Sequence, residues 1–307
     1  MAIDEHNMDH AGDRPRTSRG RFELVAGRKF NLDGWKRLVL HLILLAGALV
    51  MLYPLIWLAS SSIKPSELIF SDPSLWPREI QLSNYSEGWT GAAEPFSTFF
   101  INSFIVSIGA VAGNLVACSL AAFAFARLNF ALKRMWFAIM LSTIMLPVHV
   151  TLIPQYILFQ EFGWVNSFLP LIVPRFLAVD AFFIFLMVQF IRGIPRDLDE
   201  AAAIDGASSF GIYWKIILPL MTPALATTAI FTFIWTYEDF LSQLVYLSDM
   251  SLYTVPLGLR LFMAARGVSA YGPMLAMSLL SLVPVLIVFL AFQRLLIEGI
   301  STTGMKG

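Results

Sequence analysis

Six apolar stretches, each long enough to cross a lipid bilayer, constrain this chain more than any other feature of its sequence. The hydrocarbon core of a bilayer is about 30 Å thick, so a helix needs about 20 apolar residues to span it. The sequence therefore predicts an all-α, polytopic membrane protein. Its transmembrane domain covers residues 36–307 and follows an N-terminal tail, residues 1–35, that we expect to be flexible and cytoplasmic. The predicted spans are residues 38–60, 98–125, 135–159, 168–190, 221–247 and 274–296.

The composition agrees with a membrane protein and argues against a soluble enzyme. Apolar residues make up 57% of the chain and charged residues only 14%, against about 45–50% and about 25% in ordinary globular proteins. So few polar residues cannot cover a water-soluble surface. The net charge of zero gives no reason to expect a nucleic-acid partner. The lone Cys118 and the scattered histidines predict neither a disulfide nor a metal site.

Positive charge distinguishes the two sides of the predicted membrane domain. Most of the 21 Lys and Arg residues lie in the tail, in the loops after the second and fourth spans, and after the last span. An even number of spans places all of these segments on one side, and loops rich in Lys and Arg stay in the cytoplasm. We therefore predict that both termini are cytoplasmic. The proline-rich segment 61–97 and the segment 248–273 then face outward.

The cytoplasmic loop between the fourth and fifth spans, residues 193–220, has its own helix signals. Pro195 suits the first turn of a helix, the acidic residues that follow suit its positive end, and Gly206 can adopt the left-handed conformation that stops it. Ser208 or Ser209 can cap a second short helix. The pattern predicts a helix, a glycine turn and a helix. On physical grounds alone it favours a well-capped surface loop over a docking element.

The same loop resembles the EAA-loop signature of the integral membrane subunits of ATP-binding-cassette importers. The resemblance rests on Glu200-Ala201-Ala202, Gly206, Ile216, Leu218 and Pro219 at these offsets. In that family the loop forms a coupling helix that sits in a cleft of the cytoplasmic ATPase subunit. The resemblance implies that this loop transmits force to such a subunit, through Glu200, Ala201, Ala202, Asp205, Gly206, Ile216, Leu218 and Pro219.

Further motifs extend the resemblance along most of the chain and are similar to those of the carbohydrate-uptake branch of this family, the maltose-type and glycerol-phosphate-type importers. These importers have a pair of permeases, and the chain is similar to the six-span member of the pair. The motifs are Trp76-Pro77, Asn84-Tyr85, Asn102-Ser103, Leu146-Pro147, Ile153-Pro154, Tyr237-Glu238-Asp239-Phe240, Tyr253-Thr254, Pro256-Leu257-Gly258 and Gln293-Arg294. The chain departs from the family pattern at Tyr237-Glu238, where Trp-Asn is common. Arg175 and Asp180 are further departures. These departures are candidate determinants of the solute.

The resemblance implies a permease subunit in a bacterial inner membrane that imports a sugar, oligosaccharide or glycoside, which can be anionic. Its implied partners are a homologous second permease, two copies of a cytoplasmic ATPase and an extracytoplasmic solute-binding protein, which the outer loops, including Trp76 and Trp89, would meet. ATP and Mg²⁺ would bind to the ATPase subunits. This chain would bind no cofactor and catalyse no reaction, because its sequence has no glycine-lysine phosphate loop.

Charged residues within the spans are candidate solute contacts, because each costs about 2.5–3.5 kcal/mol at the bilayer centre. Arg175 and Asp180 are five residues apart, a poor spacing for a helical pair. They can form a structural pair, Arg175 can extend to the outer interface, or Arg175 can bind an anionic group of the solute. Glu238 and Asp239 are adjacent, so only one of them can face a given cavity.

Aromatic and hydroxyl-bonding side chains near the end of the fifth span are typical of sugar recognition. The candidates are Trp235, Tyr237 and Gln243, whereas an interfacial aromatic belt explains Tyr246 equally well. In the second span Gly109, Gly113, Ala117 and Ala121 form a stripe of small residues, which favours packing within the chain over a contact between subunits. Prolines in and beside the spans predict bent or broken helices.

Two other classes of protein stay open at this point. An ion-coupled secondary transporter could carry protons on Glu238 or Asp239, but it would leave the EAA spacing unexplained. An intramembrane enzyme would need a nucleophile and a base at a recognisable spacing, and the sequence offers none.

Overall fold

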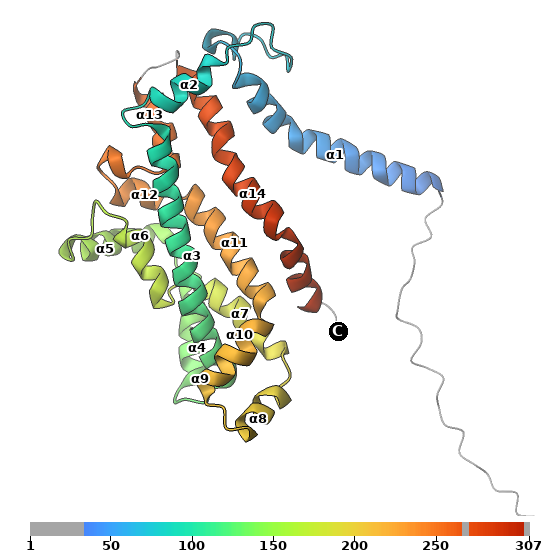
Figure 1. The fold of residues 1–307 in the computed structure, drawn as a ribbon, viewed down its shortest axis with the longest axis vertical. Coiled ribbons are helices and arrows are strands. Elements are labelled where there is room, and N and C mark those ends of the chain that lie inside the picture. Colours follow the sequence, from blue (N-terminus) through green and yellow to red (C-terminus); the bar gives the residue numbers. More distant parts are fainter. Residues whose placement is uncertain (1–33, 266–269, 304–307) are drawn as a thin grey trace, which may run out of the picture. The chain divides into compact units, whose positions relative to one another are not determined.

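The computed structural model describes residues 34–265 and 270–303, and every regular element among them is helical (Figure 1). The predicted tail lies outside these residues except for its last two. The chain divides into two units, Met1–Tyr53 and Pro54–Gly307, with the boundary inside helix α1 (Gly34–Ser61). The features below belong to the second unit unless α1 is named.

Among the residues that the structure describes, four segments are long and apolar enough to cross a membrane by length and composition. They are α1, α3 (Phe96–Arg127), the segment Leu169–Gly193 and α14 (Tyr271–Thr303). Two bent helix pairs pass the same test and raise the number to six, the number that the sequence predicts. One pair is α4 (Lys133–Thr143) with α5 (Val148–Glu161), and the other joins Ser209–Leu220 to α11 (Thr222–Glu238).

The predicted third and fourth spans are broken near prolines. Helices α4 and α5 meet at an angle of 101°, and Pro147 lies at the start of α5. A residue before proline is disfavoured in helical conformation, and proline has no N–H group to continue the helix. The fourth span consists of α6 (Leu169–Ile172), the 3₁₀ turn η2 (Val173–Leu177) and α7 (Ala181–Gly193), with Ala178 in the left-handed conformation between the last two.

The predicted fifth span, residues 221–247, is not one helix. Helix α11 ends at Glu238, Asp239 is extended, and a separate short helix, α12 (Leu241–Tyr246), follows. The reason is local, because Asp239 Oδ1 accepts a hydrogen bond of 3.0 Å from the backbone N–H of Ser242 and so starts the new helix.

Helix α3 runs through the middle of the second unit and packs against α7, α11 and η2 (Figure 1). Its glycines explain the close approach. A Cβ atom on Gly109 would lie 2.9 Å from Ile172 Cδ1, and one on Gly113 would lie 2.8 Å from Phe176 Cδ2. The expectation that the small-residue stripe serves packing within the chain is confirmed at both glycines.

Hydrogen bonds fix the first part of α3 to the segment that precedes α13 (Val255–Ala265). Asn102 Nδ2 donates to the carbonyl oxygens of Ser251 and Tyr253, at 2.8 and 2.9 Å. Ser103 Oγ accepts from the backbone N–H of Val255 at 2.9 Å. The short helix α2 (Ser83–Thr90) lies at the same end of the unit (Figure 1).

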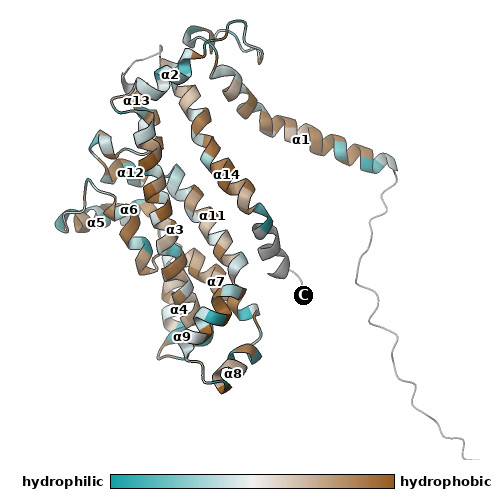
Figure 2. Cartoon of the chain, in the orientation of Figure 1, coloured by the Kyte–Doolittle hydropathy of each residue, from teal (hydrophilic) through white to brown (hydrophobic). Residues whose placement is uncertain are grey.

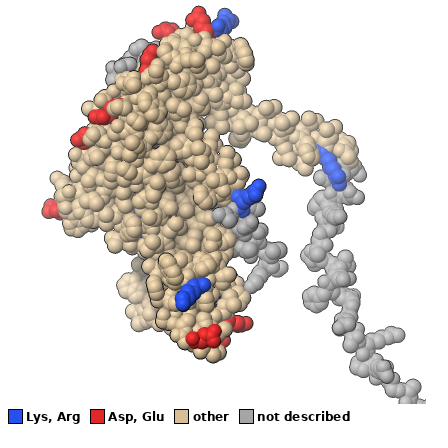
Figure 3. All heavy atoms as spheres, viewed as in Figure 1, with Lys and Arg blue, Asp and Glu red and all other residues tan. Residues whose placement is uncertain are grey.

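Hydrophobic residues predominate along the long helices (Figure 2). Many of their large apolar side chains are exposed. Ile101, Ile105 and Ile108 of α3 are all exposed, as expected for a helix that meets lipid or another subunit. On the face in Figure 3 most charged side chains lie toward the two ends of the unit, and much of the surface between them is uncharged. This distribution fits a membrane-spanning body with polar ends.

Candidate functional site

A cavity of about 510 Å³ lies among α3, α5, the broken fourth span, α11 and α12. Part of its wall is apolar, including Val106, Phe159 and Leu171. The rest carries polar and charged groups, which an apolar surround makes strong recognition elements. The polar and charged lining residues are Thr143, Thr151, Gln155, Arg175, Asp180, Thr236, Asp239, Ser242, Gln243 and Tyr246.

Arg175 and Asp180 form an ion pair in this wall, with 2.5 Å between Arg175 Nη1 and Asp180 Oδ2. Their spacing is unsuitable for an α-helix, but η2 and the left-handed Ala178 turn the chain back and bring the two side chains together. A structural pair, one of the sequence-based alternatives, is therefore confirmed. Both side chains remain partly exposed, at 31% and 23%, so a solute contact stays a prediction.

A buried amide holds the carboxylate of this pair from the other side. Asn114, fully buried in α3, donates from Nδ2 to Asp180 Oδ2 at 2.6 Å and to Thr232 Oγ1 of α11 at 3.0 Å. Three segments of the chain thus meet at one polar network. The sequence analysis did not single out Asn114, although a polar amide in an apolar span was a signal that could have found it.

Asp239 lines the cavity and Glu238 does not. The expectation that only one of these two carboxylates can face a given cavity is confirmed, and Asp239 is the one that does. Glu238 is exposed, whereas the carboxylate of Asp239 already accepts the Ser242 N–H group.

The predicted sugar-binding side chains separate in the structure, and only Gln243 lines the cavity. Its Nε2 donates to the Thr236 carbonyl oxygen at 2.9 Å, and its Oε1 accepts from the Thr254 hydroxyl. Tyr237 is buried against Phe104 and Phe233. Trp235 is exposed and packs beside aromatic rings of α7 and α11, namely Phe182, Phe183 and Phe231.

Several other residues of the cavity went unnoticed in the sequence, among them Thr151 and Gln155, whereas Tyr246 was noticed there as a candidate for an interfacial aromatic belt. Thr151 and Gln155 are four residues apart on α5 and line the cavity from that helix. Tyr246 is 3% exposed and lines it from α12. Its hydroxyl oxygen is buried and has no hydrogen-bond partner in the described part of the chain.

At the other end of the second unit lies the loop of residues 193–220, for which the family resemblance implies coupling to an ATPase and which is called the coupling loop below. Helix α8 (Asp197–Ile204) begins on acidic residues, Gly206 follows it with φ +82°, and Ser208 Oγ accepts from the Gly211 N–H at 3.2 Å to cap α9 (Ser209–Ile212). The predicted helix, glycine turn and helix are confirmed. A π-helical turn, η3 (Tyr213–Ile217), and α10 (Leu218–Leu220) lead into α11.

The signature residues of this loop fall into two groups. Ala202, Ile216 and Leu218 pack against the buried cluster formed by α3, α7 and η3. Exposed residues form the second group, which comprises Glu200, Ala201, Asp205, Gly206 and Pro219. Beside them large apolar side chains are exposed, including Ile204 at 87%, Phe210 at 65% and Trp214 at 59%. Phe210 and Trp214 stack on each other, and exposed apolar groups of this kind suit a surface that docks on another protein.

Arg127, the last residue of α3, fastens this loop to the helix bundle. Its Nε lies 2.7 Å from Asp199 Oδ2 of α8, and its Nη2 donates to the Ile194 carbonyl oxygen at 2.7 Å. The Nε–H bond is not aligned for a hydrogen bond, so the contact with Asp199 is an ion pair. The side chains are only 6% and 17% exposed.

Replacing Arg127 with methionine is expected to loosen α8, because Asp199 is then left without its cation in a poorly solvated place. We expect amide hydrogen exchange in residues 197–204 to accelerate at least tenfold, equivalent to about 1.4 kcal/mol. Hydrogen exchange followed by mass spectrometry measures this. Exposed Arg196 provides the control as Arg196→Gln, and adding Asp199→Leu to Arg127→Met should restore protection. Unchanged exchange in Arg127→Met would contradict this role.

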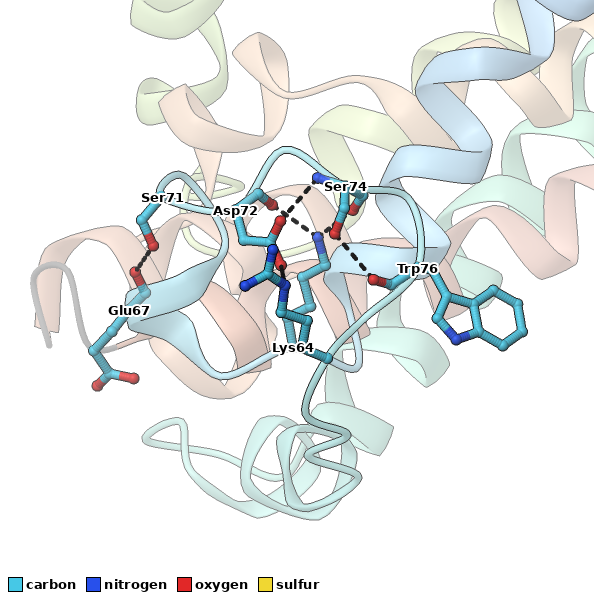
Figure 4. Close-up of polar contacts among 7 residues, drawn as sticks. Lys64, Glu67, Ser71, Asp72, Ser74 and Trp76 are labelled. Carbon is cyan, nitrogen blue, oxygen red and sulfur yellow. Dashed lines mark hydrogen bonds and ion pairs between the residues drawn. The ribbon is translucent and has the colours of Figure 1, made fainter.

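Trp76 projects from a loop that a buried lysine organises (Figure 4). Lys64 is 1% exposed, and its Nζ donates to the carbonyl oxygens of Asp72 and Ser74, at 2.9 and 2.5 Å. Hydrogen bonds from Ser74 to the Asp72 carboxylate hold its pKa below the usual value. Trp76 is 86% exposed. Trp89, the other predicted contact, packs on Phe96 and Phe100 and is 39% exposed.

Comparison with known proteins gives concordant matches. The model of the family described as "Binding-protein-dependent transport system inner membrane component" matches residues 113–301. The arabinooligosaccharides transport system permease protein of Halalkalibacterium halodurans is 34% identical over 85% of this chain and 93% of its own length. The trehalose/maltose transport system permease protein of Thermococcus litoralis is 30% identical, with 89% and 98% covered.

A solved structure has the same fold. It is a chain of a bacterial ABC transporter involved in the import of the acidic polysaccharide alginate, with a TM-score of 0.74 and 22% identity, and the match covers 85% of this chain and 96% of that one. The expected all-α, polytopic importer-permease fold is confirmed.

Proposed function

Because the chain belongs to the family of binding-protein-dependent transport system inner membrane components, we propose that it is the permease subunit of an ATP-driven importer for a sugar, oligosaccharide or glycoside. As a member of this family it is a transport subunit and not an enzyme. Several relatives carry names of sugar transport systems, for arabinooligosaccharides, trehalose and maltose, and galactooligosaccharides. They support a solute of this class.

The observation that carries the proposal is the coupling loop. An isolated transporter has no reason to expose Ile204, Phe210 and Trp214 together on a short helical projection at a polar end. A cytoplasmic ATPase subunit that receives this projection would bury them. Movement of the ATPase would then reach α3 through Arg127 and Asp199, which join the two elements directly.

The partners in this proposal are a homologous second permease, two copies of the ATPase and an extracytoplasmic solute-binding protein. ATP and Mg²⁺ bind to the ATPase subunits, and this chain has no ATPase site of its own. The loop that carries α8 and both termini are cytoplasmic, in agreement with the Lys and Arg distribution. The opposite end, with exposed Trp76, meets the solute-binding protein.

The cavity contributes half of the translocation pathway in this proposal. Its hydroxyl, amide and carboxylate groups match the hydrogen-bonding capacity of a sugar. The rival, a proton-coupled carrier, needs a carboxylate on the pathway that binds and releases a proton. Glu238 does not line the cavity. Asp239 does, but its carboxylate is already engaged by the Ser242 N–H group, and this engagement favours the importer.

Co-purification tests the proposal. The tagged chain is extracted from native membranes, the proteins that accompany it are identified by mass spectrometry, and ATP hydrolysis by the purified material is measured. We expect a second permease and an ATP-hydrolysing subunit. A chain that purifies alone, without ATPase activity and with transport that follows the proton gradient, would contradict the proposal and return Asp239 to consideration.

A further inference from the structure

The Arg175–Asp180 pair is built into the cavity wall by tight packing rather than left free to rotate. A Cβ atom on Gly113 would lie 2.9 Å from both the backbone carbonyl carbon and Cβ of Arg175, so α3 touches the turn that carries this arginine. The next residue, Asn114, holds Asp180 Oδ2. Two successive residues of α3 thus fix the backbone of one partner and the carboxylate of the other.

A purely structural pair has no need to face a cavity. Removing two charges from water is costly, and well-packed apolar side chains of similar size often stabilise a fold as well or better. A pair that served stability alone would be fully enclosed. Instead both side chains line the cavity, and 31% of the arginine and 23% of the aspartate side chain stay exposed.

The exposed parts of this pair have unused hydrogen-bonding capacity. A guanidinium has five N–H donors, and among the described residues Arg175 uses its Nη1 group toward Asp180. Asp180 accepts both of its side-chain hydrogen bonds on Oδ2, which leaves Oδ1 to accept another. A donor group beside an acceptor oxygen suits adjacent hydroxyl groups, because each hydroxyl both donates and accepts.

The charge balance of the wall disfavours an acidic solute. The charged residues that line the cavity are one cation, Arg175, and two carboxylates, Asp180 and Asp239. Asp180 already matches the charge of the arginine at 2.5 Å. An anion near Arg175 would therefore be close to Asp180 as well, and in a partly desolvated cavity their repulsion is weakly screened.

We propose that the Arg175–Asp180 pair binds the solute and selects neutral, hydroxyl-rich solutes over acidic ones. This inference rests on the proposed importer function and specifies its solute. The sequence alone left Arg175 as a candidate site for an anion. Asp180 neutralises the charge of Arg175, so the arginine no longer attracts an anion but can still donate hydrogen bonds. Its expected partners are therefore the hydroxyl groups of the solute.

The test uses cells that contain the complete transporter and a mixture of two probe classes, neutral malto- and xylo-oligosaccharides and oligosaccharides that carry uronic acids. Imported species are measured by mass spectrometry, and the amount of chain in the membrane is measured in parallel. We expect the native chain to import neutral species preferentially. Arg175→Gln should lower this import at least tenfold, whereas Arg134→Gln, which changes an exposed arginine outside the cavity, should leave it unchanged.

A double variant separates solute binding from structural support. Arg175→Gln combined with Asp180→Asn leaves no unpaired charge, so the amount of chain in the membrane should recover while import stays low. Asp180→Asn alone exposes the arginine charge and should raise the ratio of acidic to neutral species at least threefold. Preferential import of acidic species by the native chain, or recovery of import in the double variant, would overturn the inference.

The proposed function fails separately. If the native transporter imports neither class of probe, this inference fails, whereas the assignment as an importer is decided by the co-purification of a second permease and an ATPase. If native import of neutral sugars is normal and Arg175→Gln matches Arg134→Gln, only the role of Arg175 is lost.

Discussion

Gly206→Val is expected to abolish transport while leaving the membrane domain folded. Gly206 has φ +82°, and in this left-handed region an ordinary residue pays about 1–2 kcal/mol, and a β-branched one more. A Cβ atom there would meet nothing within 4 Å, so the effect acts through the backbone. The turn must change conformation, and Ile204 and Phe210, which flank it, would no longer present one surface to the ATPase subunit.

Co-purification of the ATPase and uptake of solute measure this effect, and we expect both to fall at least tenfold. Gly206→Asn is the matched control, because asparagine tolerates the left-handed conformation and should retain most activity. Equal activity of the valine and asparagine variants would show that the turn conformation is irrelevant to coupling. Loss of chain from the membrane in the valine variant alone would show that the glycine serves folding.

Gly113→Val is expected to destabilise the whole domain and to inactivate it. The added Cβ would lie 2.8 Å from Phe176 Cδ2 and 2.9 Å from the backbone carbonyl carbon of Arg175, and the backbone cannot move aside as a flexible side chain can. Overpacking of this kind costs about 1–3 kcal/mol or more. Relieving it would push η2 away from α3 and separate Asp180 from Asn114.

Thermal unfolding of the purified complex and solute uptake measure the outcome. We expect a clear drop in the midpoint temperature and loss of uptake. Ala112→Val is the matched control, because Ala112 is the preceding residue of α3 and is exposed. A Gly113→Val variant as stable and as active as Ala112→Val would refute the close packing described here.

Hydrophobic runs and the positions of glycine, proline and capping residues predicted the local structure well where its causes lie in neighbouring residues. The apolar runs gave the helices, and Gly206 and Ser208 gave the turn and cap of the coupling loop. Pro147 explains the break between α4 and α5. The end of α11 was missed, because nothing in an apolar run shows that Asp239 will accept the Ser242 N–H group.

The candidate site was harder to predict because it depends on which faces of distant segments meet. Arg175 and Asp180 were found from their charge, but their contact needs a left-handed Ala178, an unusual conformation for alanine. Tyr237 and Trp235 were chosen for their chemistry, yet neither of them lines the cavity. The role assigned to the EAA residues came from family resemblance and stays a prediction for each residue.

The three attachments of α3 have a mechanical consequence. This helix of 32 residues is about 48 Å long. Near its beginning Asn102 holds the segment before α13, in its middle Asn114 holds the wall of the cavity, and at its end Arg127 holds α8. None of these three contact points can shift along the helix axis unless its contact breaks or the other two shift with it. A displacement of one end of α3 therefore moves the other end as well, because the helix behaves as a rigid body. No series of side-chain rearrangements between the two ends is needed.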